Sequence, residues 1–226
     1  MKRSKTYRKV DQKIEDKTYT LEEAIALLVA HPLAKFDESL EVHVRLAIDP
    51  KKGDQQVRSS VTLPHGTGKE RRIAVITTTA VKEAKEANAD LVGGEEVIED
   101  IKSGKFFGEK YDVLVATPEM MPKLASVARI LGPRGMMPNP KSDTVTTKIA
   151  EVVTSLKKGK LQYKNDNTGN IHQAVGKRSM GEQKLQENVQ AFIEAIQKAK
   201  PEGVKGKYMV NVSLCTTMSP GIAIEF

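Results

Sequence analysis

Two short apolar segments in the middle of the chain constrain its fold more than any other feature. Residues 71–78 (RRIAVITT) and 111–117 (YDVLVAT) are almost unbroken apolar runs bounded by polar residues, which is typical of strands covered on both faces. Helical patterns alternate with these runs, and a short strand pattern lies between them at residues 90–92. This order of alternating strands and helices predicts a parallel sheet between two layers of helices.

The central region carries four helical patterns, and a different style of sequence lies on either side of it. Helices are expected over residues 81–88, 95–103, 119–131 and 144–158. In the flanks, apolar and polar residues alternate, which predicts strands with one buried face. These strands are expected over residues 39–49, 56–64, 160–166, 171–177 and 207–215, and the first two are expected to pair as an antiparallel ribbon.

Two further helices are expected in the flanks. Thr20 and Glu23 form a capping box ahead of an amphipathic segment that Pro32 ends. A second amphipathic helix over residues 181–200 ends at Pro201. The flanks therefore predict an α+β domain built from both ends of the chain, with the central α/β region inserted into it.

Charge and cysteine content exclude several classes of protein. The chain of 226 residues has 36 Lys+Arg against 29 Asp+Glu, a net charge of +7 and a single cysteine, Cys215. One cysteine excludes a disulfide framework and a thiolate metal cluster. The four histidines lack the spacing of metal ligands, so no metal is expected. Aromatic residues make up only 4%, so base stacking on an aromatic platform is not the expected mode of nucleic-acid binding.

The first nine residues hold five Lys or Arg and no acid. They predict either a flexible basic arm, which gains affinity for a polyanion by releasing counterions, or an ordinary solvated tail. No apolar segment follows these charges, and no apolar run in the chain approaches the ~20 residues of a membrane span. We therefore expect a soluble protein that is not secreted.

A glycine-rich segment raises the alternative of a nucleotide-binding enzyme, because nucleotides often bind at such loops beside a parallel sheet. Residues 66–69 (GTGK) resemble the end of a phosphate-binding loop, but Leu63 stands at the first glycine position and Glu70 at the hydroxyl position. No dinucleotide-binding or hydrolase motif occurs. The sequence therefore gives the enzyme hypothesis no motif on which to rest.

Two loops have compositions that suit contact with RNA. Residues 131–141 combine three prolines, two glycines and two cations, so Arg134, Lys141 and backbone N–H groups can meet phosphate. The same composition fits a connection braced against the other domain. Residues 213–221 run from a strand into hydroxyls, a methionine and a Pro-Gly turn. They suit contacts with RNA 2′-OH groups or an ordinary turn.

Four motifs in register resemble the bacterial-type ribosomal protein L1 family of the large subunit. They are LGPRGMMPNPK at 131–141, DPKKGDQQVRSSVTLPHGTGK at 49–69, NDNTGNIHQAVGK at 165–177 and CTTMSPG at 215–221. The resemblance extends over nearly the whole chain. It implies a two-domain α/β and α+β fold, in which residues 1–67 and 159–226 form a discontinuous α+β rRNA-binding domain and residues 68–158 form an inserted Rossmann-like, three-layer α/β domain.

The resemblance also implies a function. Members of the family are structural constituents of the large ribosomal subunit and not enzymes. They bind large-subunit rRNA, form the mobile stalk beside the E site that helps release deacylated tRNA, and repress their own operon by binding its mRNA. The implied setting is a cytoplasmic ribosome, with no cofactor, metal, membrane or homo-oligomer. A free-standing regulator whose main target is mRNA is the alternative, and it would use the same surface.

Carried over to this sequence, the resemblance implies an RNA surface of mixed chemistry. Its cations would neutralise phosphates, Phe36 and Met218 would pack on sugars or bases, and threonine hydroxyls would contact 2′-OH groups. Glu41 would accept from a base or a 2′-OH, orient Arg45, or be a structural partner. The implied residues are Lys35, Phe36, Asp37, Ser39, Glu41, His43, Arg45, His172, Lys177, Ser179, Thr216, Thr217 and Met218, with Arg134, Asn139 and Lys141 as a candidate tRNA-binding or interdomain loop.

One position departs from the family pattern. Ser219 follows Met218 where the family usually has glycine. Serine costs little at negative φ but about 1 kcal/mol or more in a left-handed turn. We expect RNA binding to survive the change.

Overall fold

The chain divides into two compact units in its computed structural model, which describes residues 4–15, 17–108, 111–140 and 143–226. The first unit combines the chain up to Lys69 with Leu161–Phe226, and the second unit is Glu70–Lys160. The first unit is therefore discontinuous in sequence, and the second is inserted into it.

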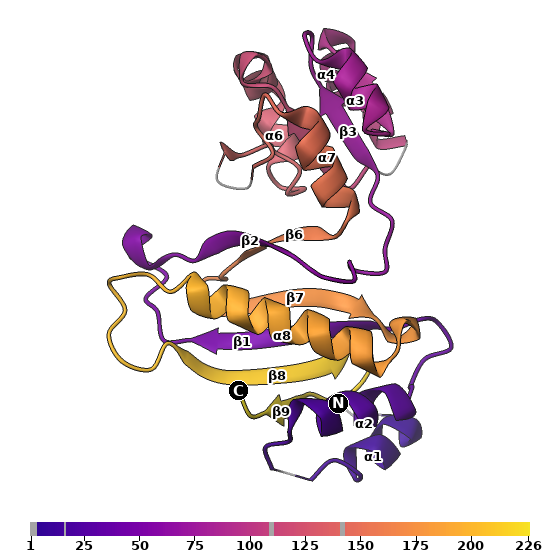
Figure 1. Cartoon of the computed structure of the whole chain (residues 1–226), viewed down its shortest axis with the longest axis vertical. Helices are drawn as coiled ribbons and strands as arrows, with labels where there is room; N and C mark the ends of the chain where they lie inside the picture. Colours follow the sequence, from indigo (N-terminus) through magenta and orange to yellow (C-terminus); the bar gives the residue numbers. More distant parts are fainter. Residues whose placement is uncertain (1–3, 16, 109–110, 141–142) are drawn as a thin grey trace. The chain divides into compact units, whose positions relative to one another are not determined.

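A four-stranded antiparallel sheet in the order β7-β1-β8-β9 forms the centre of the first unit (Figure 1). Its strands are β1 (Ser39–Leu46), β7 (Asn170–Lys177), β8 (Met209–Thr216) and β9 (Ile222–Ile224). Burial alternates along β1, where Leu40, Val42, Val44 and Leu46 are buried and the residues between them are half-buried or exposed. One face of the sheet therefore builds the core and the opposite face remains open, as is usual for antiparallel sheets.

Two helices cover the buried face of this sheet (Figure 1). The first, α2 (Leu21–Ala30), begins at the predicted capping box, in which Thr20 and Glu23 each bond the other's backbone N–H. The second, α8 (Glu182–Lys198), contributes Leu185, Val189, Phe192 and Ile196 to the core. Both predicted helices of the flanks are confirmed.

The predicted ribbon between residues 39–49 and 56–64 is wrong. Strand β2 (Arg58–Thr62) pairs with β6 (Lys160–Lys164) in a separate two-stranded sheet, whereas β1 pairs with β7 and β8. Beside this small sheet, the Asn165 carboxamide accepts a hydrogen bond from the Val57 N–H (2.8 Å), and the Asn165 N–H donates to the Val57 carbonyl (3.0 Å). A short loop favours pairing between neighbouring strands. Strand β2 nevertheless pairs with the distant β6 and does not join the sheet that contains β1.

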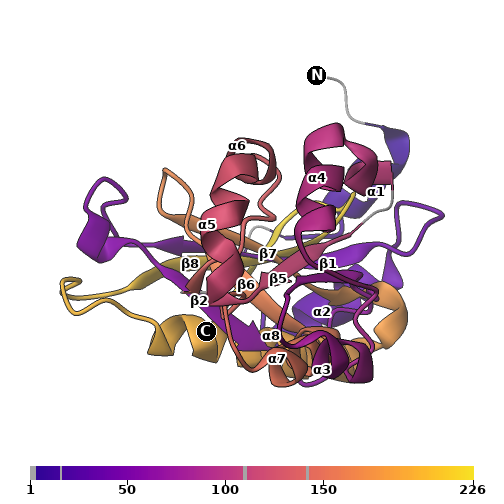
Figure 2. The ribbon, with the colours of Figure 1, turned by 90° about the horizontal axis from the view of Figure 1, so that it is seen from above.

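The second unit contains a three-stranded parallel sheet in the order β4-β3-β5. Its strands are β3 (Ile73–Ile76), β4 (Leu91–Gly93) and β5 (Val113–Ala116). Helices lie on both sides of it (Figure 2), with α4 (Glu95–Ser103), α5 (Met121–Leu124) and α6 (Ala128–Leu131) on one side and α3 (Val81–Glu86) and α7 (Ile149–Lys157) on the other. The predicted three-layer α/β arrangement is confirmed.

The single helix predicted over residues 119–131 is wrong, because this segment is broken into short turns. The 3₁₀ turns Pro118–Met120 and Ala125–Val127 alternate with α5 and α6. Pro118 and Pro122 stand at the starts of two of these pieces. A proline has no N–H to donate within a helix and is tolerated only in its first turn, so each proline begins a new piece.

The helix predicted over residues 144–158 begins later than expected, at Ile149. Before it, Val145 forms a parallel bridge with Ala116. The Ala116 N–H donates to the Thr144 carbonyl (3.0 Å), and the Thr146 N–H donates to the Ala116 carbonyl (3.1 Å). Residues 144–146 therefore extend the sheet beside β5 instead of starting the helix.

The basic N-terminal segment is helical where the structure describes it. Residues Lys5–Asp11 form α1, which Ser4 caps by accepting a hydrogen bond from the Tyr7 N–H (3.2 Å), and none of its residues is buried. The expectation of a flexible arm is therefore wrong for this segment, while residues 1–3 lie outside the described residues. Among the described helices, none combines the length and apolar character needed to cross a bilayer.

Candidate nucleic-acid interface

The residues assigned to an RNA surface fall into two places on the first unit. One place is the end of the sheet where β1 starts and β7 and β8 finish, and the other is the open face of the sheet. The register places Ser39 beside Lys177 and Leu40 beside Thr216. Strand pairing thus joins segments that are up to 178 residues apart in the chain.

Hydrogen bonds tie the end of the sheet together. The Ser39 N–H donates to Oγ1 of Thr217 (3.1 Å), and the Thr217 N–H donates to the Ser39 carbonyl (3.1 Å). Nζ of Lys177 donates to Oγ of Ser39 (2.8 Å) and to the Asp37 carbonyl (3.1 Å). The Asp37 carboxylate accepts from the N–H (3.1 Å) and the hydroxyl (2.7 Å) of Ser179. We call this end the sheet-end platform: Lys35, Phe36, Asp37, Ser39, Lys177, Ser179, Thr217 and Met218.

The charged groups of Asp37 and Lys177 form hydrogen bonds within the platform. The hydroxyl of Ser179, with its N–H and the neighbouring cations, lowers the pKa of Asp37 below its usual value. The Lys177 ammonium has three donors, and Ser39 and the Asp37 carbonyl take two of them. Lys177 therefore braces the platform and keeps one donor for an external acceptor.

Two large apolar side chains project from the platform. Phe36 and Met218 are each 53% exposed, and Lys35 beside Phe36 is exposed. Phe36 directly precedes Asp37, and Met218 directly follows Thr217, so both are attached to hydrogen-bonded backbone. Phe36 and Met218 are therefore available to an external partner.

The predicted surface role of the Thr216 hydroxyl is wrong. Thr216 is 2% exposed, and its Oγ1 is enclosed without a hydrogen-bond partner among the described residues. The residue lies on the buried side of β8, next to Leu40 of β1 in the register. Of the two neighbouring threonines, only Thr217 presents its side chain at the surface.

Ser219 fits its turn without strain. Among the described non-glycine residues, only Asn88 and Asp143 have a positive φ, so Ser219 avoids the left-handed region. Its hydroxyl accepts from the Thr216 N–H (2.8 Å) and donates to the Pro220 carbonyl (3.0 Å). Ser219 thus closes the turn that presents Met218, by a side-chain contact that glycine cannot make.

Glu38 supports the platform and was missed from the sequence. It is fully buried, and its Oε1 accepts from the N–H groups of Leu33 (3.2 Å) and Ala34 (2.7 Å). Its carbonyl accepts from the Arg178 N–H (2.9 Å). Glu38 therefore fixes the loop that carries Lys35, a role for which an acid at the start of an alternating strand gives no signal.

The open face of the sheet carries the implied residues Glu41, His43, Arg45 and His172. Asn170, Asn211, Ser213 and Cys215 lie on the same face, and we call all eight the outer face. The register pairs His43 with His172 on one side and with Ser213 on the other, and pairs Glu41 with Cys215. A hollow of about 200 Å³ lies around the middle of this face. The strand alternation puts Asn211, Ser213 and Cys215 on one side of β8, but only the register shows that this is the side of His43.

The two histidines of the outer face are in contact. Nδ1 of His43 lies 2.8 Å from Nδ1 of His172, and Nε2 of His43 lies 3.1 Å from Sγ of Cys215. Burial, followed by the neighbouring His172, lowers the pKa of His43. Burial, together with Glu41, raises the pKa of Cys215 to about 11. His43 and Cys215 are therefore uncharged at physiological pH and lie beside the Glu41 carboxylate, while the exposed cation Arg45 lies at the far end of β1.

The candidate tRNA-binding or interdomain loop belongs to the second unit. Arg134 is exposed, whereas the Asn139 backbone is braced by Thr144, whose Oγ1 accepts from the Asn139 N–H (2.8 Å) and donates to its carbonyl (3.2 Å). Lys141 lies outside the described residues. The structure thus provides a brace for this loop within its own unit.

The glycine-rich segment of residues 66–69 packs against the protein itself. A Cβ on Gly68 would lie 3.0 Å from Cγ of Lys177, and the Gly66 carbonyl accepts from Nδ2 of Asn188 (2.8 Å). The segment therefore packs against β7 and α8 within the first unit.

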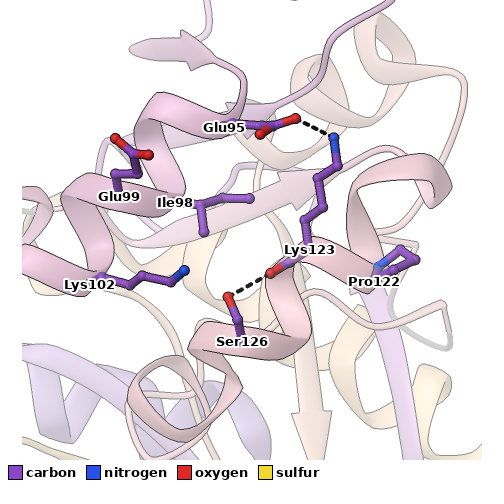
Figure 3. Close-up of a pocket in the computed structure, with 7 residues that line it drawn as sticks. All are labelled: Glu95, Ile98, Glu99, Lys102, Pro122, Lys123 and Ser126. Carbon is purple, nitrogen blue, oxygen red and sulfur yellow. Dashed lines mark hydrogen bonds and ion pairs between the residues drawn. The ribbon is translucent and has the colours of Figure 1, made fainter.

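A pocket of about 270 Å³ opens on the second unit between α4 and α5. Figure 3 shows Glu95 and Lys123 directed toward each other across it, where they form an ion pair that lowers the pKa of Glu95. The Ser126 hydroxyl donates to the Lys123 carbonyl (2.8 Å). Glu95, Lys123 and the Ser126 hydroxyl are thus engaged in contacts within the protein.

Comparisons with known proteins show the family of the chain. The sequence profile of the ribosomal protein L1p/L10e family matches residues 28–220, a stretch that includes both the platform and the outer face. The chain belongs to this family. Its members are structural ribosomal proteins rather than enzymes.

Curated relatives match along their whole length. Proteins named large ribosomal subunit protein uL1 from Mycoplasma capricolum and from Kosmotoga olearia are 49% and 48% identical to the chain, each over 99% of it and over 98% and 96% of their own lengths. A protein of the same name from Phytoplasma australiense is 48% identical over 100% of the chain and 98% of its own length. The similarity therefore extends over both units of the chain.

Proposed function

We propose that the chain, a structural protein of the large ribosomal subunit, binds the rRNA of that subunit directly through the sheet-end platform and the outer face. In the same proposal it forms the mobile stalk beside the E site and helps release deacylated tRNA. It also represses translation of its own operon by binding the mRNA on the same surface. The exposed Arg134 loop of the second unit is the proposed contact for E-site tRNA.

The observation that carries this proposal is the hydrogen-bonded assembly of the platform from three distant segments. Because the backbone around Phe36 and Met218 is already fixed, binding RNA there loses little conformational entropy. The two side chains can pack on sugars or bases, and the Thr217 hydroxyl, which accepts from the Ser39 N–H, keeps its own proton for a 2′-OH. Lys35 and the third donor of Lys177 supply phosphate contacts.

An RNA-binding measurement over a salt series tests the proposal. The purified chain is titrated with a large-subunit rRNA fragment that carries the stalk junction, and separately with an unrelated RNA duplex. We expect nanomolar affinity for the fragment and a gap of about a thousandfold over the duplex. Equal and steeply salt-dependent binding to both RNAs would mean that only the net charge of +7 acts.

Two variants separate the roles within the platform. Met218→Ala removes an apolar contact, so it should weaken specific binding without changing the salt dependence. Lys35→Ala removes a phosphate contact and should lower the salt slope by about one unit. Lys184→Ala, which removes an exposed cation from the opposite, helix-covered side, is the matched control and should bind like wild type. Identical slopes for the Met218 and Lys35 variants would contradict these roles.

The alternative of a free-standing mRNA regulator uses the same surface and needs a different experiment. Cell extracts are separated by sedimentation, and the chain is quantified in each fraction. A ribosomal constituent should comigrate almost entirely with large subunits, whereas a regulator should remain mainly in the ribosome-free fractions. A dominant ribosome-free pool in growing cells would overturn the structural role.

A further inference from the structure

Three side chains of the types that bind zinc meet on the outer face of the first unit. Nε2 of His43 lies 3.1 Å from Sγ of Cys215 and 3.8 Å from Oε2 of Glu41, and the three ligand atoms all lie within 4.8 Å of one another. Glu41 and His43 are alternate residues of β1, and Cys215 of β8 is paired with Glu41. All three side chains therefore project from the same side of two hydrogen-bonded strands.

The distances suit a single small cation. Zinc bonds are about 2.3 Å to sulfur and about 2.0 to 2.2 Å to nitrogen and oxygen, which at tetrahedral angles separates the ligand atoms by about 3.4 to 3.6 Å. The separations of 3.1 and 3.8 Å around His43 bracket that range. Small side-chain rotations would therefore bring Glu41, His43 and Cys215 into coordination without moving the sheet.

We propose that Glu41, His43 and Cys215 form a binding site for one zinc-type divalent cation. A thiolate and an imidazole favour zinc over magnesium or calcium, which prefer oxygen ligands. Three protein ligands leave a fourth position for water. Binding replaces the thiol proton of Cys215, which passes to solvent, and forms a metal–sulfur bond in its place.

A second observation supports this assignment, because the other ring nitrogen of His43 is already engaged. Histidines that bind metals usually pass their second N–H to a nearby acceptor, which fixes the ring. Nδ1 of His43 contacts Nδ1 of His172 at 2.8 Å, and Nε2 of His172 lies 3.6 Å from Oδ2 of Asp166. The Asp166 carboxylate, held by Thr168 and Asn170, favours the N–H of His172 on Nε2.

This arrangement sets the tautomer of His43. In the neutral form with its proton on Nε2, His172 accepts at Nδ1, and His43 then donates from its own Nδ1. The lone pair of His43 then lies on Nε2, which faces Cys215 and Glu41. The chain Asp166–His172–His43 thus orients the nitrogen that the cation needs, in the manner of outer-sphere partners at known metal sites.

The sequence-based expectation of no metal rested on spacing along the chain. His43 and Cys215 are 172 residues apart, and the two histidines are 129 residues apart. Neither separation resembles a metal-binding motif. The strand register of the folded sheet makes these residues neighbours, so the spacing argument does not apply to them.

Cobalt provides a direct test, because a thiolate bound to Co²⁺ gives a charge-transfer band in the near ultraviolet. The chain has one cysteine, so the band reports on Cys215 alone. The full-length wild-type protein is titrated with Co²⁺ and then with Zn²⁺. We expect the band to saturate at one equivalent of Co²⁺ and to disappear when Zn²⁺ replaces it. The test contains no RNA, so its outcome is independent of the proposed rRNA binding.

Variants distinguish a built site from a reactive thiol. Cys215→Ser should abolish the band, and His43→Ala and Glu41→Gln should each lower the affinity for Co²⁺. His172→Gln should lower it by about 10- to 100-fold, as loss of an outer-sphere partner does. His65→Ala is the matched control, because His65 also faces a carboxylate, that of Glu187, at 2.5 Å.

The outcomes separate clearly. A one-equivalent band that weakens in the His43, Glu41 and His172 variants and persists in the His65 variant supports the site. Absence of the band in wild type overturns it. An unchanged band in both His43→Ala and Glu41→Gln also overturns it, since the thiol alone would then bind the cation. Circular dichroism of each variant verifies that the fold is retained.

Discussion

Asn188 ties helix α8 to two other segments of the first unit. It is fully buried, and its Oδ1 accepts from the His65 N–H (3.1 Å). Its Nδ2 donates to the carbonyls of Gly66 (2.8 Å) and Val175 (2.9 Å). One carboxamide therefore joins α8, β7 and the segment that leads out of the first unit, and we predict that Asn188→Ala destabilises the protein strongly.

The magnitude follows from the three hydrogen bonds. Each contributes about 1 kcal/mol net, and a buried group left without a partner costs about 1 to 3 kcal/mol. Losing all three bonds should therefore cost about 3 kcal/mol. For a protein of this size, about 2 to 4 °C of melting temperature accompanies each kcal/mol, so the melting temperature should fall by about 6 to 12 °C.

Urea unfolding followed by far-ultraviolet circular dichroism measures this loss. Gln190→Ala is the matched control, because Gln190 lies exposed on the same helix, and its removal should change the free energy of unfolding by less than about 0.5 kcal/mol. If Asn188→Ala were within about 1 kcal/mol of wild type, the three contacts would not hold α8 in place, and the reasoning would be refuted.

Three further predictions concern the turn after β8, the platform and the core. Ser219→Gly should cost about 1 kcal/mol in urea unfolding, because the Thr216 N–H loses its side-chain acceptor, while rRNA affinity stays within twofold; a rise in stability would contradict the capping role. The pKa of Asp37 in the folded state lies below 3.8, so the stability advantage of wild type over Asp37→Asn should be complete above pH 3.8 and vanish as pH falls through the lower folded value. An advantage that does not depend on pH would exclude this linkage. Gly176→Ala should cost about 1 to 3 kcal/mol, since the new Cβ would lie 2.5 Å from a leucine methyl of α8, whereas Gly53→Ala has no neighbour within 4 Å and should unfold like wild type.

Local sequence signals predicted several elements well. The capping box at Thr20 and Glu23 marks the start of α2, and the helix expected over residues 95–103 is α4 itself. The apolar run around residues 73–76 is a fully buried strand. These predictions succeed because the relevant contacts lie within a few residues, so helix periodicity and capping chemistry are visible in the sequence.

The sequence did not predict features that depend on residues far apart in the chain. Nothing within residues 56–64 shows that their partner is β6, about a hundred residues later. In the same way, alternation along β8 does not show which side of the strand is buried, and the surface position that the resemblance implies for Thr216 is wrong. A shift of one residue in register exchanges the two faces of a strand, and only the assembled sheet fixes it.

The candidate interface also combines features that the sequence predicted with features that only the structure shows. The resemblance to the family supplied the residue types of the platform, including Phe36, Lys35 and Met218, but not how they are held. Glu38 and Ser219 hold them through buried or local hydrogen bonds. No composition or periodicity distinguishes such residues from ordinary polar positions.

The sequence by itself thus determined most of the helices and strands, their order and the α/β pattern between two α+β flanks, because burial periodicity and turn chemistry are local properties. Tertiary structure alone decided the strand partners, the buried face of β8 and the contact of His43 with His172 and Cys215. The physical reason is that pairing and register are set by the free energy of the whole sheet and its covering helices. That free energy is a sum over contacts between residues far apart in the chain, which no local pattern records.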